Sequence, residues 1–169
     1  MPAQYIIGTG ISIGGNIYIG PGPVIPNARK AIFGYGNPSV TNLVSSTGVV
    51  SNDVTTVGTS RYYLAASGYG LDKAIFGYGA DSTSGDALSI TNLVSNTGVV
   101  ANDTSGVGTS RFLLAASGYG VDKAIFGYGA DNNSNLVSMT NLVSNTGVVA
   151  TDTTGVGTAR YQLAASTYG

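Results

Sequence analysis

The sequence KAIFGYG at Lys30–Gly36 occurs again at 73–79 and at 123–129. Other segments repeat at the same interval: TNLVS begins at 41, 91 and 140, TGVV at 47, 97 and 146, and LAAS at 64, 114 and 163. A repeat of about fifty residues is typical of propeller blades and other stacked units. Function must therefore be sought in the array and in the positions where its copies differ.

The composition argues against chemistry at a reactive side chain. The 169 residues are 43% hydrophobic and only 9% charged, and they contain no His, Cys, Trp or Glu. Imidazole bases, thiol nucleophiles and His or Cys metal sites are thereby excluded. A net charge of -1 provides no attraction for nucleic acid or an anionic membrane. We expect no enzyme activity, no cofactor, no metal, no nucleic-acid partner and no membrane insertion, and the missing Cys leaves the redox compartment open.

Nearly all charges occupy repeated positions. The repeated arginines are Arg61, Arg111 and Arg160, and the matching acidic triplet is Asp53, Asp103 and Asp152. A catalytic pair normally places two titratable groups in different environments, whereas these groups recur identically. The pattern therefore predicts one structural ion pair or network per repeat.

Residues 1–29 lie outside the repeat. Alternation at 11–13 and 17–19, separated by Gly14, Gly15 and Asn16, predicts a β-hairpin. The prolines at 21, 23 and 26 predict a stiff linker. There is no basic n-region of a signal peptide, and the glycines disfavour a membrane helix. An uncharged hairpin is an aggregation-prone edge, so we expect residues 1–28 to dock against a larger virion or filament assembly.

The repeat unit predicts an all-β fold. From Arg61 it reads RYYLAASGYG, LDKAIFGYG, a variable loop, SITNLVSNTG and VVANDTSGVGTS. Each piece is a short apolar run bounded by Gly, Asn, Asp or Ser, which predicts four short antiparallel strands, with tight turns at 71–72 and 121–122. No helical period is sustained, and a β-helix would need a much shorter rung.

This unit resembles the kelch repeat of β-propellers. The resemblance covers residues 30–169: an Arg opens a small apolar strand, AIFGYG follows, and a variable loop precedes the last two strands. Gly-Tyr-Gly replaces the usual Gly-Gly pair, and the usual Trp is absent. The sequence motifs KAIFGYG, TNLVSNTGVVA, GVGTAR and LAAS are similar to those of kelch-like arrays in tailed-phage and microbial surface proteins. The resemblance implies a propeller of four-stranded blades and carries no common activity.

The phase of the repeat predicts strand exchange between chains. Residues 30–60 supply a blade without its first strand, 61–110 and 111–159 supply whole blades, and 160–169 supply a closing strand. About three blades are fewer than the four of the smallest propellers, so we expect a homo-oligomer of two copies with six blades, or an open polymer. The predicted interface residues are Lys30, Ala31, Ile32, Phe33, Arg160, Tyr161, Leu163, Ala164 and Ala165.

The copies differ most in the loops at 80–90 and 130–139. Variable loops on a constant scaffold are common places for binding specificity, although neutral drift in solvated loops is the favoured explanation of the variation. The residues suited to hydrogen bonding a sugar are Asp81, Ser82, Thr83, Asp86, Asp131, Asn132 and Asn133. The repeated tyrosines at 35, 69, 78, 119, 128 and 168 suit either sugar stacking or packing between blades, and we expect the core.

These observations favour a non-enzymatic structural or attachment protein of an extracellular assembly, with a phage tail or capsid fibre as the leading interpretation and cell-surface glycans as candidate ligands. One alternative is a soluble oligomeric lectin-like propeller. Another is a self-assembling filament subunit. The expected location is extracellular or in a virion.

Overall fold

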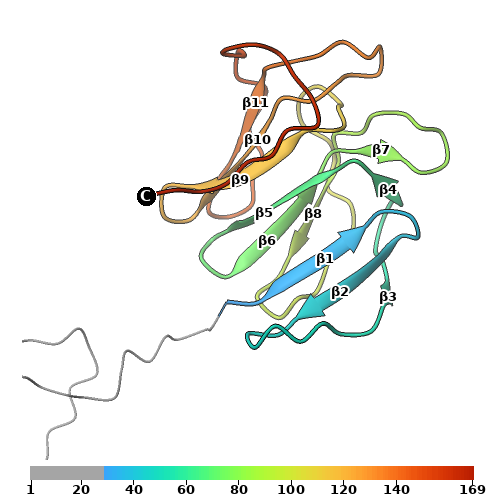
Figure 1. Cartoon of the computed structure of the whole chain (residues 1–169), viewed down its shortest axis with the longest axis vertical. Helices are drawn as coiled ribbons and strands as arrows, with labels where there is room; N and C mark the ends of the chain where they lie inside the picture. The colour runs from blue at the N-terminus through green and yellow to red at the C-terminus, as the bar shows by residue number, and fades with distance from the viewer. Residues whose placement is uncertain (1–28) are drawn as a thin grey trace, which may run out of the picture.

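The computed structural model describes residues 29–169, which form small antiparallel β-sheets and no helix (Figure 1). The prediction of an all-β, antiparallel fold is confirmed. Three three-stranded sheets follow one another in an open row, and the described residues do not close into a ring (Figure 1). The hairpin and most of the linker expected within residues 1–29 lie outside the described residues.

The three sheets come from consecutive segments of the chain. Sheet 1 contains β1 (Ala31–Tyr35), β2 (Val40–Val44) and β3 (Val54–Thr55). Sheet 2 contains β5 (Ala65–Tyr69), β6 (Lys73–Gly77) and β8 (Thr91–Val94). Sheet 3 contains β9 (Ala115–Tyr119), β10 (Lys123–Gly127) and β11 (Thr140–Val143). The short strands β4 (Arg61–Tyr62) and β7 (Ala80–Asp81) pair with each other.

The sheets use the same register, but sheet 1 lacks one strand. The repeated AIFG segment forms β1, β6 and β10; β6 pairs with β5 and β8, and β10 pairs with β9 and β11. Within residues 29–169, β1 pairs only with β2 and has a free edge. The fourth strand of the predicted unit is β3 in sheet 1. In the other sheets it makes only isolated bridges, at Val100 and Thr104 in sheet 2 and at Val149 and Thr153 in sheet 3.

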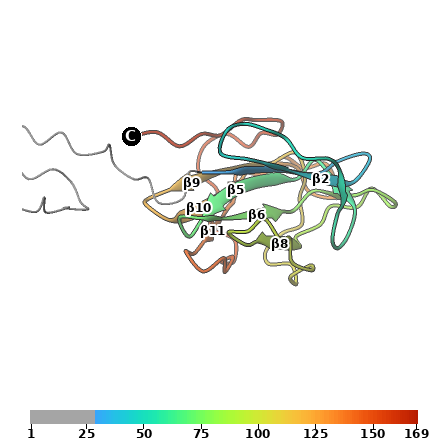
Figure 2. The same cartoon turned by 90° about the horizontal axis from the view of Figure 1, so that it is seen from below.

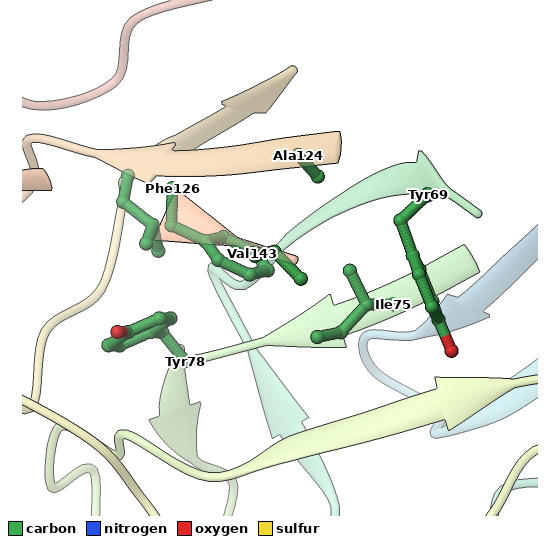
Figure 3. Close-up of a cluster of buried hydrophobic side chains, with 7 residues drawn as sticks. Tyr69, Ile75, Tyr78, Ala124, Phe126 and Val143 are labelled. Atoms are coloured by element: carbon green, nitrogen blue, oxygen red, sulfur yellow. The ribbon is translucent and has the colours of Figure 1, made fainter. Parts of the chain in front are cut away.

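Alternation along β6 explains why the sheets stack. Successive side chains of a strand point to opposite faces. Ile75 belongs to the apolar cluster shared with sheet 3, and Phe76 belongs to the cluster shared with sheet 1. Both are almost fully buried, so β6 is covered on both faces. Figure 3 shows Ile75 and Tyr78 of sheet 2 near Phe126 and Val143 of sheet 3.

A backbone turn at the end of each middle strand positions a tyrosine between sheets. Tyr78 has φ 63° and Gly79 has φ 100°, in the left-handed region. Such a conformation costs a non-glycine residue roughly 1–3 kcal/mol. Burial of the Tyr78 ring and the bond from its hydroxyl to the Val107 carbonyl oxygen (3.1 Å) offset that cost. The turns expected at 71–72 and 121–122 are also present.

The first strands of the repeats lie side by side. Strand β5 packs beside β9, and the segment 160–169 runs along the other side of β9 (Figures 1 and 2). The Thr167 hydroxyl donates to the Gly118 carbonyl oxygen (2.9 Å), and the Gln162 amide donates to the Leu113 carbonyl oxygen (2.9 Å). Residues 160–169 thus occupy the place of a further first strand, yet they pair with no middle strand among residues 29–169.

Candidate functional site

A buried arginine joins sheet 1 to sheet 2. Arg61 is fully buried, and its Cζ lies 4.3 Å from the centre of the Tyr35 ring in sheet 1. On the other side its Nη2 donates to Asn92 Oδ1 at 2.5 Å, and its Nη1 lies 3.7 Å from Asp103 Oδ1. We call these four residues the first arginine cluster.

The same arrangement joins sheet 2 to sheet 3. Arg111 is also fully buried, and its Cζ lies 4.4 Å from the centre of the Tyr78 ring. Its Nη2 donates to Asn141 Oδ1, and its Nη1 lies 3.5 Å from Asp152 Oδ1. These four residues form the second arginine cluster. The predicted network of repeated charges is present in both clusters, and each connects neighbouring sheets.

Electrostatics holds each cluster in one charge state. Burial lowers the pKa of Arg61 and of Arg111, but an arginine remains charged at neutral pH. Burial alone would raise the pKa of Asp103. Hydrogen bonds from Asn92 and Thr59, together with the charge of Arg61, outweigh burial and bring that pKa below its ordinary value. In the second cluster, hydrogen bonds from Asn141 and Thr109 and the charge of Arg111 likewise outweigh burial and lower the pKa of Asp152.

The burial of Tyr78 raises its pKa to about 12, so its hydroxyl stays protonated and donates its hydrogen bond at neutral pH. The arrangement is suited to holding sheets together.

The first sheet presents half of such a cluster. Asn42 Nδ2 donates to Asp53 Oδ1 (2.7 Å) and to the Ser51 carbonyl oxygen (3.1 Å), as Asn92 does toward Asp103 and Ala101. No arginine of the described chain reaches this pair. The surface of sheet 1 that carries this pair is called the start face: Phe33, Asn42, Gly48 and Asp53. Asn42 is half-buried and the other three residues are exposed.

The third sheet presents the other half. The Cζ of Arg160 lies 4.2 Å from the centre of the Tyr128 ring, but the side chain is exposed and no ion pair forms among residues 29–169. The corresponding surface is called the end face: Gly127, Tyr128, Leu142 and Arg160. Leu142 and Arg160 are exposed, Tyr128 is half-buried and Gly127 is buried. Residues 29–169 therefore contain two complete clusters between sheets, an Asn–Asp pair without arginine on sheet 1, and an Arg–Tyr pair without a carboxylate on sheet 3.

The predicted interface residues gather at these two ends. Exposed positions are Lys30, Ala31, Phe33, Arg160, Tyr161, Ala164 and Ala165, and half-buried positions are Ile32 and Leu163. A groove of about 870 Å³ is lined by Lys30, by residues 31–32 of β1 and by residues 66–68 of β5, among others. It borders the edge of β1 that has no strand partner in the described chain.

The two variable loops touch, and their polar groups mostly bond within the loops. Asp81 Oδ1 accepts hydrogen bonds from the amides of Thr83 (2.7 Å) and Ser84 (3.1 Å), which lower the pKa of Asp81. Asn132 Oδ1 accepts a hydrogen bond from the Ala87 amide, which links the two loops.

The second loop is organised in the same way. The carboxylate of Asp131 accepts hydrogen bonds from the Asn135 side chain and from the amides of Asn135 and Asn133, which lower its pKa. Ser82, Thr83, Asp86, Asn132 and Asn133 are exposed. The loops thus form one connected polar surface.

The repeated tyrosines divide between core and surface. Tyr35, Tyr69 and Tyr78 are buried, which confirms the expected core role for these three. Tyr168 is 97% exposed, and Tyr119 and Tyr128 are half-buried.

Sequence reasoning missed the asparagines of the clusters. Asn42, Asn92 and Asn141 recur in the TNLVS segment, so their repetition beside the Arg and Asp triplets was the available signal. It also missed that glycines of the middle strand form seats for phenylalanine rings. A Cβ atom on Gly34 would lie only 2.8 Å from Phe76 Cζ, so the glycine makes room for the ring.

In the part of the chain that the structure describes, no group of His, Cys, Asp or Glu residues could hold a metal ion. Over residues 29–169, no helix has the length and apolar character needed to cross a bilayer. No protein-family model matches the chain, and no curated protein matches its sequence.

Proposed function

We propose that this chain is a non-enzymatic structural or attachment subunit whose copies join end to end, as in a phage tail or capsid fibre. The resemblance of its repeats to kelch-like arrays of phage and microbial surface proteins supports the extracellular setting. In this proposal residues 1–28 dock the subunit, and the loops at 80–90 and 130–139 are displayed at regular intervals.

One observation carries the proposal: sheets 1 and 3, on the outside of the row, each carry half of a structure that is complete at both junctions between neighbouring sheets. Arg61 and Arg111 are fully buried between sheets, whereas Arg160 is exposed. Unpaired strand edges and exposed apolar faces favour association with another chain. Pairing of residues 160–169 with β1 of another copy would give four-stranded blades, in rings of six or in an open polymer.

The test is the mass of the native particle combined with its image. The full chain is expected to form multiples of its 17.0 kDa mass, and electron microscopy separates rings from fibres. Removal of residues 160–169 is expected to leave single subunits with intact β-sheet circular dichroism. A full chain that stays monomeric at high concentration would contradict the proposal.

A second candidate function is glycan binding by the displayed loops. The observation that favours it is the link between the loops through Asn132 and Ala87, which makes one polar surface. Replacing both loops with the short sequence at 37–40 should abolish binding on a glycan array while leaving the assembly unchanged. Equal glycan binding after the replacement would rule out this candidate, and the assembly proposal would be unaffected.

A further inference from the structure

Building on the proposed end-to-end assembly, we propose that the end face of one copy binds the start face of a second copy by forming a third arginine cluster. In this cluster Arg160 of one copy reaches Asn42 and Asp53 of the next. The partner of each face is thus another copy of this chain, bound in one direction only.

The interface has two templates inside the chain. The first and second arginine clusters agree in geometry: the arginine Cζ lies 4.3 and 4.4 Å from the tyrosine ring centre, and the ion pairs measure 3.7 and 3.5 Å. Since the ends carry the same residue types at equivalent positions, joining sheet 3 to another sheet 1 requires no contact that the protein does not already make.

The acceptor half is formed in advance. Asn42 Nδ2 holds Asp53 Oδ1 at 2.7 Å, and Asn92 Nδ2 holds Asp103 Oδ1 at 2.9 Å where an arginine is bound. Asn42 Oδ1 accepts no hydrogen bond from the described residues, whereas Asn92 Oδ1 accepts one from Arg61. The start face therefore offers a carboxylate and an amide oxygen in the arrangement that binds a guanidinium.

The donor half is also formed in advance. Arg160 Nη1 donates to the Thr158 carbonyl oxygen at 3.3 Å, the same distance as between Arg61 Nη1 and the Thr59 carbonyl oxygen. Its stacking on Tyr128 at 4.2 Å also matches the buried clusters. Little side-chain entropy is then lost when the next copy binds, which favours affinity.

Apolar contacts at the two ends are complementary as well. The exposed fraction of Phe33 is 62%, against 3% for Phe76 and 0% for Phe126 at equivalent positions. Each buried ring covers a glycine of the preceding sheet, Gly34 or Gly77. Gly127 is the third such glycine, and no ring covers it in the described chain. It provides the seat for Phe33 of the second copy.

A second apolar contact runs in the opposite direction. Leu43 covers Gly98 of the following sheet, and Leu93 covers Gly147. Leu142 of sheet 3 is 40% exposed, and Gly48 of sheet 1 has nothing within 4 Å of its Cβ position. Because each face offers a protrusion and accepts another, only an end face and a start face fit. Such a heterologous contact builds a closed ring or an open fibre.

The register of the shared sheet follows from the two complete sheets. The pairs there are Gly68↔Ala74 and Gly118↔Ala124. The equivalent pair places Thr167 of one copy opposite Ala31 of the next. Thr167 is already held beside β9 by its hydrogen bond to the Gly118 carbonyl oxygen. Residues 160–169 are therefore positioned in the register that pairing with β1 of the next copy requires. Within one chain Arg160 and Asp53 form no ion pair, and the row of sheets is open.

Cysteine cross-linking tests the direction and the register. The natural chain has no Cys. Two full-length variants, Ala31→Cys and Thr167→Cys, carry tags of different length so that the two chains can be distinguished by size. They are mixed and mildly oxidised. Paired residues on neighbouring strands bring their Cβ atoms within reach of a disulfide. We expect dimers that contain one chain of each length, and none in either variant alone. The control replaces Ala31→Cys with Ile32→Cys, whose side chain points to the other face.

Dimers of Ala31→Cys with itself, or equal cross-linking in the control, would overturn the proposed register and direction. Absence of mixed dimers in a preparation that is shown by mass to be assembled would overturn this interface but leave the proposed assembly intact. A full chain that is monomeric would overturn both.

A double-mutant cycle tests the cluster itself. Arg160→Gln and Asp53→Asn, each on a different face, should weaken association by roughly 30-fold or more, because each leaves a buried charge without its partner. The loss of association affinity in the double variant should be much smaller than the product of the losses in the two single variants. Lys123→Gln, which removes an exposed charge from sheet 3, serves as the control. Association of both variants as tight as the control, or full additivity, would overturn the third cluster.

Discussion

Arg61 and Arg111 are fully buried, and at the scale of single residues a buried cation is costly unless its donors find acceptors. Nη1 and Nη2 of both arginines find them, whereas neither Nε has a hydrogen-bond partner in the described chain. The asparagine of each cluster supplies that acceptor and orients the aspartate at the same time, because its Oδ1 accepts from arginine while its Nδ2 donates to the carboxylate. One amide therefore fixes the relative position of two charges.

Asn141→Ala is expected to lower the free energy of unfolding by about 3 kcal/mol, since it leaves Arg111 and Asp152 without their shared partner. Urea unfolding followed by circular dichroism gives the value. The matched control is Asn42→Ala in dilute, dissociated protein, where no arginine depends on the amide and a loss of about 1 kcal/mol is expected. Equal losses for the two variants would contradict this account of the cluster.

Acid should weaken the same clusters. The pKa values of Asp103 and Asp152 lie below their ordinary value of 3.8. A depressed carboxyl pKa contributes stability that is complete above the unfolded pKa and is lost as pH falls through the folded pKa. The free energy of unfolding should be level from pH 7 to about 5 and should decrease below pH 3.8. Asp152→Asn should reduce the steepness of that decrease in urea titrations, and an unchanged profile would contradict the assignment.

At the scale of the element, the middle strand decides how closely the sheets approach. In AIFG the Ile and Phe side chains cover opposite faces, and the glycine accepts the phenylalanine of the next sheet. A strand normally gains from a larger residue than glycine. Here the missing side chain is required, because a Cβ on Gly77 would lie 2.6 Å from Phe126 Cζ.

Gly77→Ala should therefore destabilise the subunit by about 1–3 kcal/mol through overpacking. Gly127→Ala is the control in dilute protein, because its Cβ would meet only Thr140 Cγ2, at 3.2 Å. That variant should change the free energy of unfolding by less than about 1 kcal/mol. Chemical denaturation of both variants checks the difference, and a similar loss in both would show that contact with the phenylalanine ring is not the cause, because the backbone entropy change of Gly→Ala alone would stabilise the chain.

Local pattern was sufficient to predict the strands and turns. The alternation in AIFG and the turn at Leu71 follow from residues close in sequence, and the structure has both. It was not sufficient for contacts between sheets. Arg61 and Asn92 are 31 residues apart, and their pairing depends on which face of each strand meets the neighbouring sheet. The repeated charges indicated a network, but the sequence did not reveal that the asparagine connects it.

The candidate ligand loops show another limit of sequence reasoning. Asp81 and Asp131 are of a residue type that often binds sugars. In the structure, however, both carboxylates accept hydrogen bonds from backbone amides of their own loops. Short polar side chains suit ligand binding and turn formation equally well, so composition does not separate the two roles. Contacts in the folded chain are needed to assign them.

For the whole molecule, association and stability should be linked. In the proposed assembly, binding of the next copy covers Phe33 and Arg160 only in the folded state, so it shifts the unfolding equilibrium by mass action. The melting temperature of the full chain should rise by roughly 5 °C when its concentration is raised about 100-fold above the dissociation constant.

Gly127→Ala should remove that concentration dependence, because a methyl group would occupy the seat of Phe33 from the next copy. Its melting temperature should equal that of the natural chain at high dilution, which calorimetry and differential scanning fluorimetry can measure over a dilution series. A melting temperature lowered by the same amount at every concentration would instead assign Gly127 a role within the subunit alone. The two outcomes differ because equivalent glycines have different partners. Gly77 accepts Phe126 of its own chain, whereas in the proposed assembly Gly127 accepts Phe33 of the next copy.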